Sequence, residues 1–167
     1  MKNCIYLFIA CSAFLLNACK DGQDGMDGLD GQNATVYYSE WFSPASWDGT
    51  SGDWYFDASA PDLTQDIVEG GVVLAYVWLA DDVYQGAAVR PLPAYAIGAN
   101  WSFLIMDYGS IEFTSDMSSR PLTSENKFRF IAIPGTIPAL KSGSLKSVQE
   151  LKNMSYQEVC KLLNIPE

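Results

Sequence analysis

The side chains that could do chemistry in this chain of 167 residues are mainly carboxylates, because the sequence contains no histidine. Without imidazole there is no Ser-His-Asp or Cys-His nucleophile, and zinc loses one of its usual protein ligands. Residues 33–167 carry sixteen Asp and Glu. Two carboxylates can hydrolyse a glycosidic bond, one as acid and one as base or nucleophile, but carboxylates in this number also form an ordinary solvated surface. The sequence therefore predicts no catalytic residue, no cofactor and no metal site.

An aromatic binding site is a more specific hypothesis, and it centres on Trp47. This tryptophan lies in Pro44–Asp53, a stretch made otherwise of small and polar residues that cannot bury it easily. An exposed indole beside Asp48 and Asp53 could stack on the apolar face of a sugar while the carboxylates bond its hydroxyls. The alternative is that Trp47 folds back as a lid over the end of the domain.

A second candidate surface is the long loop predicted over Asp81–Asn100. It carries Tyr84, Arg90 and Tyr95. Connecting loops lie on protein surfaces and often supply binding residues. The candidate ligand-binding residues are therefore Trp47, Asp48, Asp53, Tyr84, Arg90 and Tyr95.

The elements that must position these side chains are strands. Runs rich in aromatic and β-branched residues, bounded by Gly, Pro, Ser and Asp, predict strands. They are Ala34–Ser43, Trp54–Ala58, Gly71–Ala80, Trp101–Asp107, Ser110–Ser115 and Asn126–Pro134. Gly71–Ala80 is apolar on both alternating sets, which predicts a central strand covered on both faces. Tyr108-Gly109 predicts a hairpin turn, and Pro91 and Pro93 exclude a central strand between them.

Two patterns predict which faces are buried near the end of the chain. Phe128 and Phe130 fall on one face of their strand, with Lys127 and Arg129 on the other. Ser155-Tyr-Gln-Glu158 is a capping box that starts a helix. Behind it, one helix face gathers apolar residues that should dock on the strands. They are Tyr156, Val159, Cys160 and Leu163.

These patterns predict a mainly β domain over residues 33–167: a single antiparallel β-sandwich, jelly-roll or immunoglobulin-like, with a short C-terminal helix. The domain has eight Lys and Arg against sixteen Asp and Glu, a net charge of −8. Nucleic acid and anionic membrane surfaces are therefore poor partners for the domain, and no nucleic-acid ligand is predicted.

The start of the chain reads as an export signal. Cys4–Leu16 is an apolar run of 13 residues, whereas a membrane-spanning helix needs about 20. Residues 1–18 are therefore predicted to be a signal peptide. Leu16-Asn-Ala-Cys19 resembles the bacterial lipobox, which implies cleavage before Cys19 and acyl chains on its sulfur and amine. Two or more chains anchor a protein stably to a membrane. The alternative is a plain secreted protein with a chance cysteine.

Residues 19–32 carry a collagen-like repeat of four triplets, with glycine at every third position from Gly22 to Gly31 and Asp directly before each glycine. Only glycine fits the axis of a collagen triple helix, but these triplets contain no proline to favour that conformation. The segment is predicted to be a flexible acidic tether. A triple helix that joins three chains remains the alternative.

The order of these features resembles a known group of proteins. A signal peptide, lipobox and Gly-X-Y triplets precede a domain that opens with Val36-Tyr-Tyr-Ser-Glu-Trp-Phe and closes with Met154-Ser-Tyr-Gln-Glu-Val. This resembles uncharacterised Bacteroidota lipoproteins with collagen-like repeats. The resemblance implies a lipid-anchored protein of the cell envelope and carries no catalytic residues. Asp21 and Asp24, close behind Cys19, resemble the export signals that send such lipoproteins to the outer leaflet of the outer membrane, which implies exposure at the cell surface.

Three functions follow as hypotheses. The first is a non-catalytic domain that binds glycans, and the second is a structural, adhesin-like module that contacts a surface protein. The third is a glycoside hydrolase built on two carboxylates. In each case the lipid anchor makes the membrane a partner of the protein.

Overall fold

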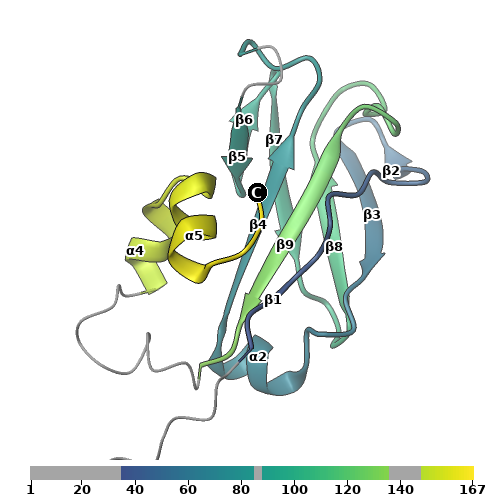
Figure 1. Ribbon diagram of the computed structural model, residues 1–167. Coiled ribbons are helices and arrows are strands. Elements are labelled where there is room, and N and C mark those ends of the chain that lie inside the picture. Colours follow the sequence, from purple (N-terminus) through teal and green to yellow (C-terminus); the bar gives the residue numbers. More distant parts are fainter. Residues whose placement is uncertain (1–34, 85–87, 136–147) are drawn as a thin grey trace, which may run out of the picture. The chain divides into compact units, whose positions relative to one another are not determined.

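The computed structural model describes residues 35–84, 88–135 and 148–167, and these residues form two antiparallel sheets packed against each other (Figure 1). The prediction of a mainly β sandwich with a short C-terminal helix is confirmed. The predicted signal peptide (1–18), Cys19 and the tether (19–32) lie outside the described residues.

One sheet has the order β1-β9-β4-β5 and the other the order β2-β3-β8-β7-β6. The strands are β1 (Tyr37–Tyr38), β2 (Asp48–Thr50), β3 (Asp53–Ser59), β4 (Val72–Trp78), β5 (Val89–Pro91), β6 (Ala94–Ala96), β7 (Ala99–Leu104), β8 (Ser110–Ser115) and β9 (Lys127–Ile133). The helices are α2 (Gln65–Gly70), α4 (Val148–Asn153) and α5 (Tyr156–Leu163). None of the helices in the described part of the chain could cross a membrane.

The main core lies between the two sheets and is largely aromatic. Phe56 and Phe113 stack with their ring centroids 5.2 Å apart, and both rings contact Phe128 from the opposite sheet. Because the inner residues of β9 alternate, Phe128, Phe130 and Ala132 all enter this core. Offset and edge-to-face aromatic pairs each add about 0.5–1.5 kcal/mol beyond their buried area.

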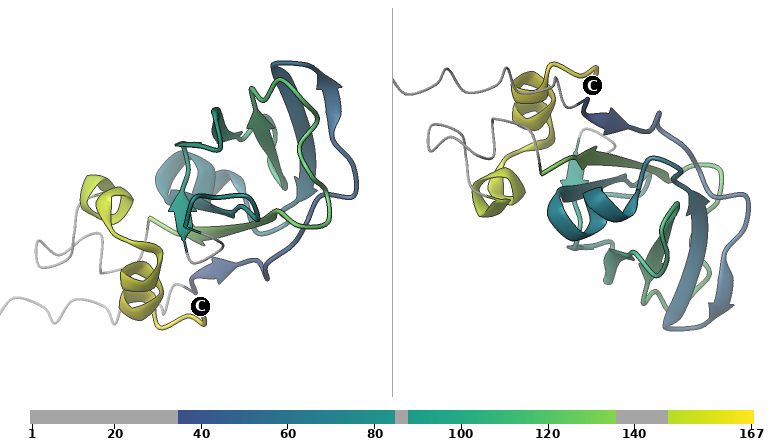
Figure 2. Two further views of the ribbon diagram at one scale, coloured as in Figure 1. Left: turned by 90° about the horizontal axis from the view of Figure 1, so that it is seen from above. Right: turned by 90° about the horizontal axis from the view of Figure 1, so that it is seen from below.

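A second apolar layer covers the outer face of the four-stranded sheet. Leu74 and Tyr76 of β4 pack there against α5, whose buried residues are Tyr156, Val159 and Cys160. The α4 and α5 helices lie beside this sheet, on the side away from the five-stranded sheet (Figure 2). The prediction that the Gly71–Ala80 run is a central strand covered on both faces is therefore confirmed.

The α5 helix begins as its capping box predicts. The Ser155 Oγ accepts the Glu158 backbone N–H at 3.3 Å, and the Glu158 carboxylate accepts the Ser155 N–H at 2.8 Å. The helix ends at Asn164, whose left-handed backbone (φ 54°) closes the last turn. Burial raises the pKa of the Cys160 thiol, so this cysteine is a packing residue and a poor nucleophile.

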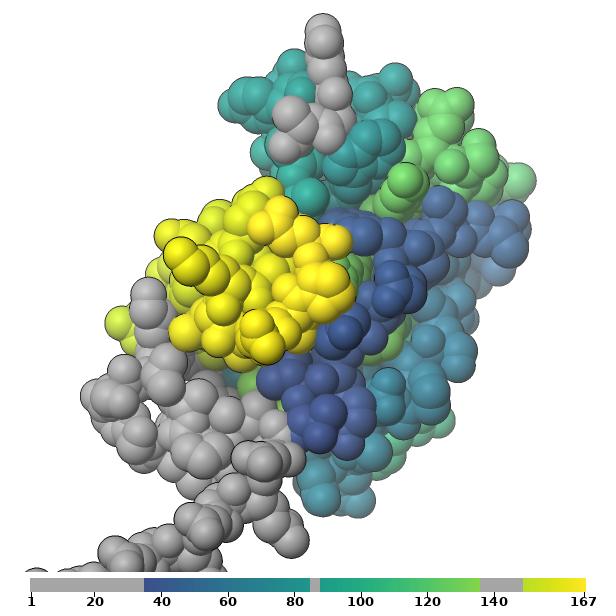
Figure 3. All heavy atoms as spheres, in the orientation of Figure 1, coloured from purple at the N-terminus to yellow at the C-terminus, as the bar shows by residue number. Residues whose placement is uncertain are grey.

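Arg129 lies on the face of β9 opposite to Phe128, as predicted, but that face is covered and Arg129 is only 1% exposed. Its guanidinium donates to the Tyr156 hydroxyl, to the Pro166 carbonyl at 2.7 Å and to the Ser39 carbonyl at 2.8 Å. Figure 3 shows the C-terminal residues in yellow beside the first described residues in purple-blue. Arg129 joins these two segments.

Two strand predictions differ in extent from the structure. Of the predicted strand Ala34–Ser43, the described residues 35–43 form only the short β1 and an isolated bridge between Phe42 and Phe128. The β7–β8 hairpin is confirmed, but its loop is longer than the predicted Tyr108-Gly109 turn. Tertiary bonds explain the longer loop, since the Gly109 N–H bonds the Leu63 carbonyl and the Tyr108 hydroxyl bonds Glu69.

The proline prediction is confirmed. The chain passes from β5 at the edge of one sheet to β6 at the edge of the other, and Pro91 and Pro93 lie at this crossing. The α2 and α4 helices were not predicted. Each is only six residues long, which is too short to show a helical period in the sequence.

Replacing Tyr156 by Phe should lower the free energy of unfolding by about 1–3 kcal/mol, because it removes a hydroxyl acceptor from the buried Arg129 guanidinium. Chemical unfolding measures the loss. The matched control is Tyr95→Phe, which removes a hydroxyl from a ring that is 68% exposed. A Tyr156→Phe protein as stable as this control would contradict the structural role of Arg129.

Candidate functional site

Trp47 is in the core and cannot stack on a sugar. It is 1% exposed, and its ring centroid lies 4.8 Å from Phe56, 5.9 Å from Phe128 and 6.0 Å from Trp101. The indole N–H points at the Leu122 carbonyl, 3.4 Å away. The hypothesis of an exposed indole is therefore wrong, and the alternative of an inward-folded Trp47 is the structure found. Burying the indole in the apolar core is more favourable than leaving it exposed to water, although its neighbours in the sequence are polar.

Asp48 and Asp53 are exposed on the β2–β3 hairpin. Gly49 allows this hairpin to close, because it has a φ of 96° and a Cβ there would lie 2.0 Å from the Asp53 carbonyl oxygen. Asp48 also lines a surface pocket of about 560 Å³ together with Phe42 and Phe56. Because Trp47 is buried, the indole on which the predicted sugar site depended is not exposed beside these two carboxylates.

Tyr84 and Arg90 come together around a buried carboxylate that the sequence did not single out. Asp82 is buried and accepts two bonds from the Arg90 guanidinium, one of them 2.9 Å long, and one from the Tyr84 backbone N–H at 3.2 Å. The hydrogen bond from Arg90 lowers the pKa of Asp82. The Arg90 guanidinium also lies 5.4 Å from the centre of the Tyr84 ring. Arg90 is thus held by the protein itself.

Tyr95 lies on β6, opposite Asn100 of β7, and is widely exposed. The structure shows no contact that joins it to the Tyr84 and Arg90 pair among the described residues. The loop predicted over Asp81–Asn100 also contains the short β5 and β6 strands. Of the six predicted residues, only Tyr84 and Arg90 form a cluster.

A different set of aromatic residues forms a surface pocket on the outer face of the four-stranded sheet. We call it the Trp78 pocket, and it has a volume of about 280 Å³. Its lining residues are Trp41, Trp78, Val89, Lys127, Tyr156, Gln157 and Glu167. Two half-buried tryptophans, one cation, one carboxylate and one amide therefore face a single small cavity.

Strand pairing and helix docking position these side chains. Trp78 is the last residue of β4, and its partners across the sheet are Lys127 of β9 and Val89 of β5. The Lys127 ammonium lies 5.4 Å from the centre of the Trp78 ring, within reach of a cation–π attraction. Trp41 meets the edge of Tyr156 at 5.5 Å, so α5 and the segment after β1 form the opposite wall.

The Trp78 pocket offers aromatic surface beside hydrogen-bonding groups. Sugar rings present apolar C–H faces to indoles and hydroxyls to polar side chains. Gln157 and Glu167 are exposed and can exchange hydrogen bonds with hydroxyls. Burial raises the pKa of the Tyr156 hydroxyl, so this group stays neutral and is already bonded to Arg129. The geometry suits binding of a small polar ring.

Sequence reasoning missed this pocket because Trp78 ends an apolar run that looks entirely like core. The sequence offers no local signal for its exposure, because the predicted strand continues to Ala80 and only the structure ends β4 at Trp78. Trp41 likewise lies in a predicted strand that is mostly irregular in the structure.

Carboxylates also meet on the outer face of the five-stranded sheet. Asp57 of β3 and Glu112 of β8 are direct cross-strand partners. Partial burial, followed by the nearby Asp57 and Asp53, raises the pKa of Glu112. Glycosidases place their two carboxylates on either side of the scissile bond, whereas these two lie side by side on one sheet. No group of three metal-ligating side chains gathers within residues 35–84, 88–135 and 148–167.

Comparison of the chain with protein-family models, with curated proteins and with solved structures found no match. The residues and their geometry therefore carry the functional argument alone.

Replacing Trp47 by Ala should lower the free energy of unfolding by about 3–5 kcal/mol, the usual cost of truncating a buried aromatic residue. Tyr95→Ala is the control, because truncating an exposed ring should change the stability by no more than about 0.5 kcal/mol. Urea unfolding of both proteins gives the two values. A near-neutral Trp47→Ala change would mean that the indole lies outside the core.

Proposed function

We propose that this protein is a lipid-anchored outer-membrane protein, exposed at the cell surface, whose β-sandwich binds glycans in the Trp78 pocket without catalysis. The observation that carries the proposal is the pairing of two half-buried tryptophans with Lys127, Gln157 and Glu167 around one cavity. The lipobox-like residues before Cys19 support the anchor, and the Gly-X-Asp tether supports display away from the membrane.

The size of the Trp78 pocket limits what it can hold. Its volume of about 280 Å³ lies just below the range of about 300–1,000 Å³ that is typical of ligand pockets. One sugar ring would enter, and the rest of a polysaccharide would lie along the surface. The mixture of one cation and one carboxylate favours neutral hydroxyls over a strongly charged ligand.

An adhesin-like function is the second candidate, and exposed apolar side chains favour it. Val83 is 79% and Tyr84 62% exposed, and Met106 is 78% exposed on the β7–β8 loop. Apolar side chains on loops are available for contact with a protein partner. In this function the tether would present the loops to a neighbouring surface protein.

A glycan-array screen of the detergent-purified protein should give saturable binding to at least one polysaccharide, detected afterwards by a change in tryptophan fluorescence. Lys127→Met should weaken that binding by about tenfold, which corresponds to about 1.4 kcal/mol, because it removes a charged hydrogen-bond donor from the rim. Trp78→Ala should weaken it further by removing the stacking surface.

Lys161→Met is the matched control, since Lys161 is exposed on α5 and does not line the pocket. It should leave glycan affinity unchanged. Equal affinity of the Lys127 and Lys161 variants would place the glycan elsewhere. An array without any bound glycan would favour the adhesin-like function.

The anchor has its own test. Cys19→Ser should move the protein from the detergent phase to the aqueous phase in a phase-partitioning experiment, because the lipid loses its acceptor sulfur. Cys160→Ser is the control, since Cys160 is a buried residue of α5 and should not carry the lipid. If Cys19→Ser stays in the detergent phase, the lipobox interpretation is wrong.

A further inference from the structure

The two sheets are both incomplete at the same side of the sandwich. The β5 strand pairs with β4 only along Tyr76–Trp78, and the β6 strand pairs with β7 only along Ala99–Trp101. The remaining halves of β4 and β7 continue without these neighbours. Unpaired strand edges are ready to accept another strand, so proteins usually cover or shorten them.

The backbone of Val73 points to this open edge. The Leu92 N–H bonds the Ala75 carbonyl at 2.8 Å, so the polar backbone groups of Ala75 face the β5 side. In a strand these groups alternate between the two sides, so those of Val73 face the same way as those of Ala75. Among the described residues, no backbone group bonds Val73 on that side. Toward the described part of the chain, its N–H and C=O are therefore an unpaired donor and acceptor.

The facing strand shows the same feature at Phe103. Ala96 and Ala99 flank a two-residue turn, where φ is positive at Ile97 and Gly98, so the backbone of Ala99 faces β6. Alternation places the backbone groups of Phe103 on that side too, beyond the end of β6. Phe103 and Val73 are both partly buried residues at the margin of the core.

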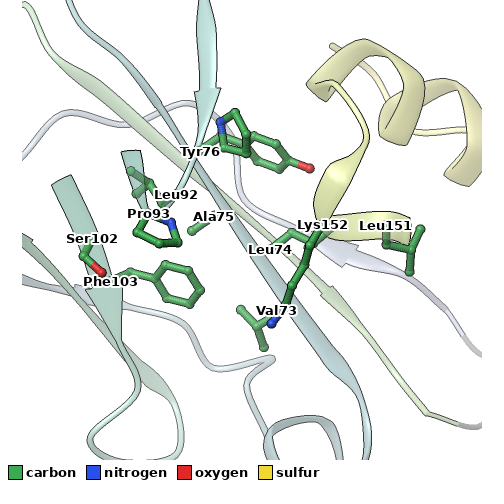
Figure 4. A pocket seen from close by; sticks show the side chains of 11 residues that line it. Val73, Leu74, Ala75, Tyr76, Leu92, Pro93, Ser102, Phe103, Leu151 and Lys152 are labelled. Carbon is green, nitrogen blue, oxygen red and sulfur yellow. The ribbon is translucent and has the colours of Figure 1, made fainter. Parts of the chain in front are cut away.

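A groove of about 350 Å³ occupies this edge. Figure 4 shows Phe103 and Val73 on opposite sides of the gap, with the Lys152 side chain reaching from α4 toward Val73. The lining residues are Val73, Leu74, Ala75, Tyr76, Pro91, Leu92, Pro93, Ser102, Phe103, Leu151 and Lys152. The groove therefore combines a free strand edge, an apolar interior and one ammonium.

We propose that this groove binds an extended peptide of a partner protein, which adds as a strand to the free edge of β4. Its alternate side chains would point inward to Phe103 and outward beneath α4. The inward positions require apolar residues. The outward positions suit carboxylates, because Lys152 is the sole charged residue among the described residues that line the groove. The ligand is thus a peptide that alternates apolar and acidic residues.

The first experiment uses a hexapeptide of alternating valine and glutamate with the detergent-purified protein. The peptide should slow the hydrogen exchange of the Val73 amide by about tenfold or more, because that amide gains an acceptor. A peptide of the same sequence with N-methylated valines should bind at least about tenfold more weakly, since it cannot complete the ladder. Equal binding of both peptides would overturn strand addition.

Two variants test the edge and the charge separately. Val73→Pro should abolish binding, because proline removes the N–H on the open side while leaving the bonds between β4 and β9. Lys152→Glu should reverse the preference, so that a valine-lysine hexapeptide binds better than the valine-glutamate one. Lys161→Glu, away from the groove, should keep the original preference. If Val73→Pro fails to fold, the Lys152 variant decides, and an unchanged preference overturns the proposal.

The free protein supplies the last test. Fast exchange at Val73 without peptide supports an open edge. Slow exchange without peptide would mean that another part of the chain, or a second copy when the solution mass doubles, already pairs with β4, and either result overturns the proposal.

Discussion

The buried guanidinium of Arg129 is the interaction on which the outer layer of this protein depends. A buried charge is costly unless hydrogen bonds and polarizable groups replace its water. Here the Ser39 and Pro166 carbonyls and the Tyr156 hydroxyl accept its hydrogen bonds, and the Tyr38, Trp41 and Tyr156 rings lie within 6.0 Å of it. One side chain thereby ties the first described residues and the C-terminal residues to β9. One wall of the Trp78 pocket, formed by Trp41 and α5, belongs to the tied segments, so the position of this wall depends on Arg129.

The outer layer also explains why one strand can be apolar on both faces. The β4 strand places Ala75 and Val77 in the core between the sheets, and Leu74 and Tyr76 under the helices. A two-layer sandwich would leave the second set in water. The outer face of the five-stranded sheet needs no cover by helices, because it carries Asp57, Glu112 and other polar residues. The two sheets therefore differ in composition because only one of them is covered by helices.

Local patterns in the sequence predicted much of this fold but little of its candidate site. Strand alternation and the Ser155 capping box depend on neighbouring residues, and the structure confirms both. The fate of Trp47 depends on Phe56, Trp101 and Phe128, which are distant in sequence, so its polar neighbours were a misleading guide. For Trp78 the error was in the opposite direction, because the apolar Gly71–Ala80 run predicts a residue covered by its neighbours, whereas Trp78 is half-buried. Its exposure depends on the point at which α5 and the neighbouring strands stop covering β4. The sequence of β4 itself does not indicate that point.

The two proposed binding surfaces share a physical cause, which is that β4 is longer than the elements that cover it. The β5 strand spans only three residues, so it leaves the edge at Val73 unpaired. At the other end of β4, the helical layer stops short and leaves Trp78 half-buried. One end therefore offers backbone hydrogen bonds and the other offers an aromatic face, which are the chemistries that suit a peptide strand and a sugar ring. The two surfaces use opposite ends of the β4–β9 ladder, which is paired along the whole of β4, so we expect the two bindings to be independent.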